Sequence, residues 1–468
     1  MKDTKCFLIW QSLNRYERRR LRKFLCSPLH NEDAVFVKLH DLFIRYEHQP
    51  DREQLAKVLF GRKKLSNQEF ARLFSRFSER IERFLALENY YAEPVREQID
   101  LLGALNQRRL SRYFPEKYRY IQEAYKRVNL RSGEYYLHAF ELEKQQHEYF
   151  ESQQLRSNRK NLTETLTALD TYYFIQKLRL CAAVLHYQSF LTLEGDVALI
   201  NEILDYLDHA QMNEVPLLHA YYLVVKSLLD PNNEIYFNQL KRLISGNQPV
   251  VELSAQRDLF AFAINYCITR INSGDTSYQR QIFELYQMAL LRNVLEQDDE
   301  LSPWDFKNIV TVALRNKEFS WTEKFIDAYK DRLPVAEKMN AITFNKARYF
   351  FAIKNYNGVL KLLQDVTYSD IFYLLDAKTT LMKTYFELGE YQPLQSLKES
   401  FRILLRRKKV ISEQNQTNYG NFARYTMKLF RTDVKDKKKL ERLGREIRTT
   451  GNIADKGWLL EKLAELGA

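Results

Sequence analysis

Apolar side chains recur at helical spacing through the first 92 residues of the chain. Leu21 and Phe24 fall on one face of a predicted helix near the start. A longer helix is predicted to begin at Ser66, because Ser66 and Glu69 have the spacing of a capping box. The apolar face of this longer helix comprises Phe70, Leu73, Phe74, Phe77, Ile81, Phe84, Leu85 and Leu87. We predict that residues 1–92 form a small helical domain.

Beyond Pro94 short polar joints interrupt the apolar periodicity. Glycine, asparagine, aspartate and proline at such joints are typical of helix ends and tight turns. The predicted joints are Arg131-Ser132-Gly133, Asn158-Arg159, Glu194-Gly195-Asp196, Asp230-Pro231-Asn232-Asn233, Ser273-Gly274-Asp275, Asn316-Lys317-Glu318, Asn355 and Gly389-Glu390. The pattern predicts a series of helical hairpins over residues 93–400.

The last third of the chain contains an internal repeat. Residues 344–363 align without gaps with residues 379–398, at an offset of 35, so that Tyr356 corresponds to Tyr391. A repeat of this length is typical of stacked helix pairs. We therefore predict that residues 130–400 form antiparallel helix pairs stacked in one right-handed superhelix.

These repeats resemble the tetratricopeptide-repeat superfamily. That family joins two helices through a glycine, an acidic residue and a tyrosine, as in Gly389-Glu390-Tyr391, and Leu381 and Tyr385 stand at its large apolar positions. The resemblance implies an all-α fold, in which a solenoid of helical-hairpin repeats follows the small N-terminal helical domain. It also implies that five residues on the concave side of the array contact a bound peptide. These are Arg348, Phe351, Asp376, Lys383 and Glu387.

The five residues carry both signs of charge around one aromatic ring. A phosphate backbone calls for a single positive sign, whereas a mixed lining suits a protein segment. We expect the charged members to be exposed, so that replacing Arg348 and Lys383 by glutamate leaves stability nearly unchanged. The sequence favours a non-catalytic interaction or scaffold protein that binds a partner protein or peptide.

The composition argues against several classes of protein. Glycine occurs 13 times and proline 10 times in 468 residues, which leaves little material for phosphate-binding glycine loops. The four cysteines form no C-x-x-C pair, so neither a zinc knuckle nor a disulfide framework is predicted. The apolar run Cys6–Trp10 is too short for a signal peptide, and no run approaches the ~18 apolar residues of a membrane helix. We expect a cytoplasmic protein without membrane contacts.

The net charge of +12 is concentrated at the two ends of the chain. Residues 1–92 hold 19 basic and 12 acidic side chains, and residues 400–468 hold 17 and 8. We predict that residues 401–468 form a basic helical cap. The alternative function is nucleic-acid binding through these basic ends. The basic residues of this alternative are Arg18, Arg19, Arg22, Arg406, Arg407, Lys408, Lys409, Lys437 and Lys438.

Two groups of side chains have the composition of a metal site. Glu143 and His147 stand four residues apart on a predicted helix, where a surface ion pair is the simpler interpretation. Asp298-Asp299-Glu300 directly precedes Leu301-Ser302-Pro303, a pattern typical of a capped helix start. No nucleotide-binding, zinc-protease or hydrolase motif occurs in the sequence. We therefore expect neither an enzyme nor a bound metal or cofactor.

Overall fold

The structure is a computed structural model that describes residues 4–46, 51–61, 66–128, 131–154, 161–188, 197–210, 214–246, 251–363, 371–407 and 411–467. Over these residues the fold is all-α, apart from one hairpin of two-residue strands. The predicted fold class is confirmed at this level. No helix in the described ranges is long and apolar enough to cross a membrane. The chain divides into two compact units, Met1–Gln176 and Lys177–Ala468.

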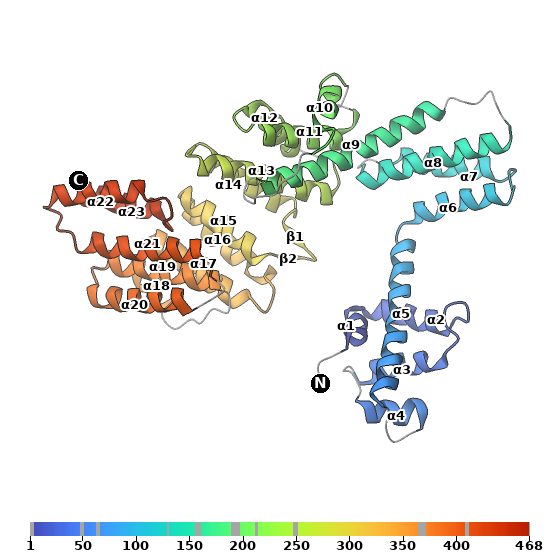
Figure 1. Ribbon diagram of the computed structural model, residues 1–468, viewed down its shortest axis with the longest axis horizontal. Coiled ribbons are helices and arrows are strands. Elements are labelled where there is room, and N and C mark those ends of the chain that lie inside the picture. Colours follow the sequence, from blue (N-terminus) through green and yellow to red (C-terminus); the bar gives the residue numbers. More distant parts are fainter. Residues whose placement is uncertain are drawn as a thin grey trace. The chain divides into compact units, whose positions relative to one another are not determined.

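The first unit contains α1 to α8 and the beginning of α9. Their bounds are α1 Lys5–Ser12, α2 Arg15–Cys26, α3 Ala34–Tyr46, α4 Arg52–Phe60, α5 Asn67–Tyr91, α6 Pro94–Gln107, α7 Phe114–Lys126, α8 Gly133–Ser152 and α9 Asn161–Gln188. Figure 1 shows α1 to α4 gathered along α5. The predicted domain limit at residue 92 falls between α5 and α6, and independent folding of residues 1–92 stays a prediction.

Aromatic side chains form the core that holds α1 to α5 together. Trp10 and Phe43 are buried, and the rings of Phe7 and Phe43 meet edge to face with centroids 5.1 Å apart. The predicted capping box of α5 is confirmed: the Ser66 hydroxyl accepts the backbone N–H of Glu69, whose carboxylate accepts the backbone N–H of Ser66. Local sequence signals and the apolar pattern therefore specify the same helix.

The second unit contains the rest of α9 and all later elements. Their bounds are α10 Ile200–Asp208, α11 Pro216–Leu229, α12 Glu234–Ser245, α13 Leu253–Asn272, α14 Tyr278–Leu291, β1 Glu296–Gln297, β2 Glu300–Leu301, α15 Pro303–Arg315, α16 Phe319–Tyr329, the short 3-10 helix Lys330–Arg332, α17 Lys338–Ala352, α18 Tyr356–Leu363, α19 Ile371–Glu387, α20 Tyr391–Arg407, α21 Glu413–Phe430, α22 Lys437–Thr449 and α23 Lys456–Gly467.

Neighbouring helices of the second unit pack in the order of the sequence. From α11 to α23 every helix contacts the next one, and the hairpins lie side by side in Figure 1. Contacts also join α11 to α13, α15 to α17, α17 to α19, α19 to α21 and α21 to α23. From α13 to α21, each odd-numbered helix therefore meets the preceding hairpin as well as the helix that follows it.

Most predicted joints coincide with the ends of helices. Gly274 and Gly389 adopt φ of 103° and 74°, the left-handed region that glycine enters without steric cost. The joint at residues 316–318 separates α15 from α16, and Asn355 directly precedes α18. The joints predicted at residues 158–159 and 194–196 lie outside the described residues.

Residues 296–301 form a hairpin where only the approach to a helix was expected. Strands β1 and β2 pair antiparallel, and the turn between them places Asp298 and Asp299 at φ of 52° and 62°. Aspartate tolerates this left-handed region better than most residues, so the acidic pair has a structural reason. Ser302 then caps α15, as predicted, by accepting the backbone N–H of Trp304.

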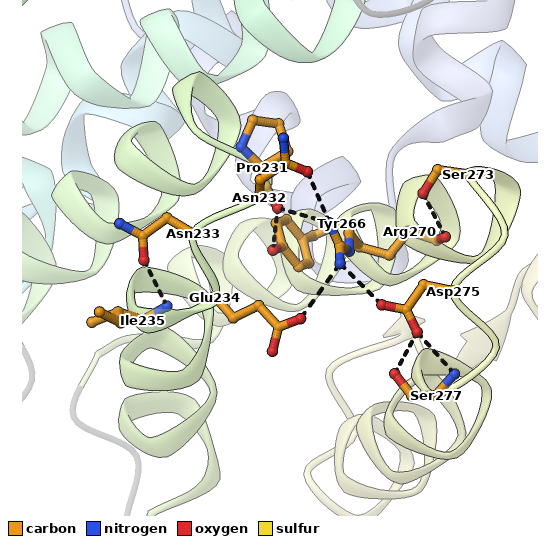
Figure 2. Close-up of polar contacts among 10 residues, drawn as sticks. All are labelled: Pro231, Asn232, Asn233, Glu234, Ile235, Tyr266, Arg270, Ser273, Asp275 and Ser277. Atoms are coloured by element: carbon orange, nitrogen blue, oxygen red, sulfur yellow. Dashed lines mark hydrogen bonds and ion pairs between the residues drawn. The ribbon is translucent and has the colours of Figure 1, made fainter.

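Polar side chains at the ends of odd-numbered helices reach back to the preceding hairpin. Figure 2 shows Arg270 of α13 donating to Asn232, 38 residues earlier, and to the carboxylates of Glu234 and Asp275. After α15, Asn316 donates to the carbonyl oxygen of Gln279, 37 residues earlier.

The same kind of contact recurs near the end of the chain. After α21, Arg431 donates to the Tyr391 hydroxyl, 40 residues earlier, at 2.6 Å. We call these three contacts, made by Arg270, Asn316 and Arg431, the joint bonds. The two residues of each joint bond lie 38, 37 and 40 positions apart in the sequence, respectively.

Candidate binding site

The side chains predicted to contact a peptide lie on two adjacent helices. Arg348 and Phe351 belong to α17, whereas Asp376, Lys383 and Glu387 belong to α19. Helix α15 contacts α17, and α21 contacts α19. We call the side of the second unit to which α13, α15, α17, α19 and α21 contribute the odd-helix face.

Asp376 joins three helices of the odd-helix face. Lys307 of α15 donates to one of its carboxylate oxygens, and the Tyr419 hydroxyl of α21 donates to the other at 2.8 Å. Burial, together with the negative charge of Asp376, raises the pKa of Tyr419, so the phenol keeps its proton and remains a donor. The carboxylate of Asp376 is therefore already matched within the protein.

Lys383 and Glu387 hold the segment that contains α23. Lys383 Nζ donates to Asp455 Oδ2 at 2.6 Å and lies 4.7 Å from the ring centroid of Phe351. Lys462 of α23 forms an ion pair with Glu387 at 2.8 Å. The expectation that Lys383 is exposed was wrong, since its side chain is only 15% exposed. The reason is that the C-terminal segment folds back over this part of the face.

Arg348 is also less accessible than expected. Its Nη1 donates to the Thr311 hydroxyl of α15. Burial lowers the pKa of Arg348; Asp376 and Asp455 oppose this shift, whereas the positive charge of Arg315 adds to it. Burial of the guanidinium is the largest cause of this shift. An anion beside the guanidinium would stabilise its charged form, as water does when the side chain is exposed.

Six interacting side chains form what we call the inner charge cluster. They are Lys307, Arg315, Arg348, Lys383, Asp376 and Asp455. Burial alone would raise the pKa of Asp455, but Lys383, Arg348 and Arg315 lower it overall, so the carboxylate stays ionised. Four cations then face two carboxylates, which leaves two positive charges in excess. The cluster is suited to an additional negative group.

A pocket of about 180 Å³ lies beside the inner charge cluster. Its apolar lining includes Ile268 of α13, Tyr286 of α14 and Val312 of α15, and its polar lining includes Thr311 and Arg315. The remaining lining residues are Ile271, Asn272, Gln279, Ile282, Asn308 and Asn316. Thr311 accepts a hydrogen bond from Arg348, and the charge of Arg315 acts on Arg348. Because Thr311 and Arg315 also line the pocket, its apolar surface lies next to positively charged side chains.

The position of this pocket does not follow from the sequence pattern. The repeat is clearest over residues 344–398, whereas the pocket lies over residues 268–316, where the joints are spaced less regularly. Asp455 was missed for another reason, since it lies within the predicted cap and its contact with Lys383 spans 72 residues. Helical spacing alone predicts which residues share a helix face, not which distant segment covers them.

The N-terminal basic residues of the alternative function are in part engaged within the protein. Arg18 lies 4.1 Å from the ring centroid of Trp10 and donates to a backbone carbonyl. Arg22 forms a two-pronged ion pair with Asp41, at 2.8 and 3.1 Å. Arg19 is exposed. Of these three arginines, Arg18 and Arg22 therefore have partners within the protein, while Arg19 and Arg22 are exposed to solvent.

The C-terminal basic residues border two grooves. Arg406 lines a groove between α20 and α21, and Lys437 lines another between α22 and α23. Lys438 is exposed on α22. The side chain of Arg407, and residues 408–409 with Lys408 and Lys409, lie outside the described residues.

The side chains considered for chemistry have other partners. Glu143 accepts the Tyr118 hydroxyl at 2.7 Å, and His147 pairs with Glu151 rather than with Glu143. Burial raises the pKa of the Cys6 thiol to about 12, which makes it a poor nucleophile.

The described part of the chain contains no group of three or more His, Cys, Asp or Glu side chains that could hold a metal ion. The odd-helix face instead presents a pocket and the inner charge cluster, and both features suit binding. Comparison with protein-family models, curated proteins and solved structures finds no match to the chain.

Proposed function

We propose that the second unit is a solenoid of helical hairpins similar to tetratricopeptide arrays, and that the protein is a non-catalytic interaction protein. The joint bonds support the first part of this proposal. They recur at the ends of α13, α15 and α21, and each joins two residues that lie 37 to 40 positions apart in the sequence. Repeat arrays of this kind present long surfaces that bind other proteins.

The binding site in this proposal is the pocket on the odd-helix face together with Arg315 and Arg348. A large apolar side chain of a partner protein enters the pocket, and a neighbouring acidic side chain lies against the two guanidinium groups. The observation that supports this occupant is the excess of two positive charges directly beside an apolar pocket. Charge-assisted bonds from guanidinium groups to a carboxylate are stronger than neutral ones.

The size of the pocket favours a side chain over a free small molecule. Sites for small molecules commonly measure about 300–1,000 Å³, and this pocket measures about 180 Å³. The site predicted from the sequence lies on α17 and α19, whereas the proposed site also includes residues of α13 and α15. Lys383 and Glu387 serve instead to hold the C-terminal segment.

A peptide-display selection against the purified full chain tests this function. Enriched peptides are expected to carry an acidic residue close to a large apolar residue. Arg315→Glu should weaken their binding at least tenfold, about 1.4 kcal/mol, because it reverses a charge at the pocket. Arg442→Glu on α22 is the matched control, since that side chain is 81% exposed and lies elsewhere.

The site is wrong if Arg315→Glu binds the enriched peptides as tightly as Arg442→Glu does. A second variant, Asn308→Trp, places a large ring at the exposed rim of the pocket and should have the same effect as Arg315→Glu. Enrichment of basic peptides would contradict the proposed chemistry of the partner.

A further inference from the structure

A groove of about 730 Å³ lies between α20 and α21. Its basic lining consists of Lys398, Arg402 and Arg406 on α20 and Arg424 on α21, and its acidic lining is Glu413. Four cations and one carboxylate leave three positive charges in excess within the groove. Glu399 lies close to Lys398 and Arg402, at 3.4 and 2.9 Å, and reduces the excess to two.

The floor of this groove is apolar and open to a ligand. Leu405 and Ala423 are buried beneath it. Gly420 of α21 also lines the groove, and a Cβ atom at this position would meet nothing within 4 Å. The absence of a side chain therefore lets a ligand approach the helix closely.

One of the arginines is held in place by its neighbour. The Arg424 guanidinium lies 4.7 Å from the ring centroid of Tyr425 and donates to the Tyr425 hydroxyl at 3.0 Å. A guanidinium fixed in this way loses less conformational freedom when it binds an anion.

We propose that the groove between α20 and α21 binds the sugar–phosphate backbone of a single-stranded nucleic acid. A row of three arginines and a lysine complements successive phosphates, and guanidinium groups match phosphate oxygens in pairs. Positively charged grooves that follow the backbone are typical of proteins that bind single strands, so we expect this groove to favour one strand over a duplex. This site is separate from the pocket between α13 and α15, and the proposal does not depend on the peptide-binding function.

Fluorescence anisotropy with the full chain and labelled 12-nucleotide oligouridine or oligothymidine tests the proposal. Binding of either strand at 50 mM salt is expected, with a slope of log K against log salt near −2, since about three phosphates contribute ~0.7 each. RNA and DNA are run separately, and binding of one or both supports the site. No binding of either strand at 50 mM salt would overturn it.

Gly420 provides a matched pair of variants. Gly420→Glu places a carboxylate in the groove and should weaken binding at least tenfold. Gly420→Ala adds only a methyl group in open space and should stay within twofold of the wild type. Equal binding by the two variants contradicts the site.

A second set of variants guards against a folding defect in Gly420→Glu. Replacing Arg402 and Arg406 together by glutamine should reduce the salt slope by about 1.4, because two phosphate contacts are lost. Arg442→Gln on α22 is the control and should leave the slope unchanged. A duplex of the same length, or a polyglutamate peptide, that binds as tightly as the single strand would overturn the proposal.

Discussion

Lys383 on α19 and Asp455, 72 residues later in the chain, form an ion pair of 2.6 Å. A second pair, between Glu387 and Lys462 at 2.8 Å, ties the same two parts of the chain together. The C-terminal helix α23 is therefore anchored to α19 by charge as well as by the contact between the rings of Phe386 and Trp458.

Replacing Lys383 by methionine should loosen α23. The change leaves Asp455, whose side chain is 38% exposed, without its main partner, and the loss of such a partly exposed ion pair costs up to about 1 kcal/mol. Hydrogen exchange of the α23 amides is expected to become faster, while exchange in α11 and α13 stays unchanged. Lys438→Met, an exposed lysine of α22, is the control. Unchanged exchange in α23 would show that the ion pair contributes nothing to anchoring it.

Replacing Gly358 by alanine should destabilise the hairpin of α17 and α18. A Cβ atom at this position would lie 2.7 Å from the Phe350 ring and 3.1 Å from the Asn355 side chain. Overpacking costs about 1–3 kcal/mol, against a gain of up to ~1 kcal/mol in helix propensity. We expect a net loss of about 1 kcal/mol in urea unfolding. Gly420→Ala, which meets open space, should instead stabilise α21; a gain in both variants would refute the close approach.

The N-terminal core should lose stability as the pH falls from about 6.5 to 4. His40 accepts the Trp10 indole N–H at 3.0 Å, and burial lowers its pKa to about 4, with Asp41 opposing and Arg22 and Arg18 adding to the shift. Below pH 6.5 His40 takes up a proton in the unfolded chain but stays neutral in the folded core. The free energy of unfolding is therefore highest above pH 6.5 and falls as the pH drops toward 4. The loss amounts to at most about 3 kcal/mol.

The measurement for His40 is hydrogen exchange of α1 and α3 at pH 7, 6 and 5, corrected for intrinsic rates. His40→Gln keeps an acceptor for Trp10 but does not titrate in this range, so it should remove most of the pH dependence. An identical pH dependence in the variant would assign the effect to other groups.

Replacing Arg270 by lysine should weaken the joint between two hairpins. A lysine amine cannot reach Asn232, Glu234 and Asp275 at once, as the planar guanidinium does in Figure 2. We expect faster hydrogen exchange at residues 231–235 and 273–278, with little change beyond α15, because contacts in the unit run between neighbours. Exchange that rises equally throughout the second unit would contradict this local role.

The helices and their ends were predictable because their signals are local. Ser66 and Ser302 cap helices where the sequence placed caps, and Gly389 ends α19 in the left-handed conformation. Each of these features depends on residues within one turn of helix. The binding surface was less predictable because its properties depend on distant segments.

Arg348 and Lys383 illustrate the difference. Their positions on α17 and α19 follow from helical spacing, but their burial depends on Thr311 and Asp455, which lie 37 and 72 residues away. Replacing both by glutamate is therefore expected to destabilise the second unit rather than leave it nearly unchanged. The same limit applies to Glu143, whose partner Tyr118 lies on another helix.

The anchoring of α23 also has a consequence for how the protein is made. The ribosome synthesises Lys383 well before Asp455, and at about 5–20 residues per second the interval is about 4 to 14 s. During that time Lys383 lies uncovered beside Phe351, and Glu387 on the same helix lacks its partner Lys462; the completed chain later covers this charged and aromatic surface. A chaperone that recognises such a surface on the nascent chain would act within this interval and lose its binding site once α23 docks.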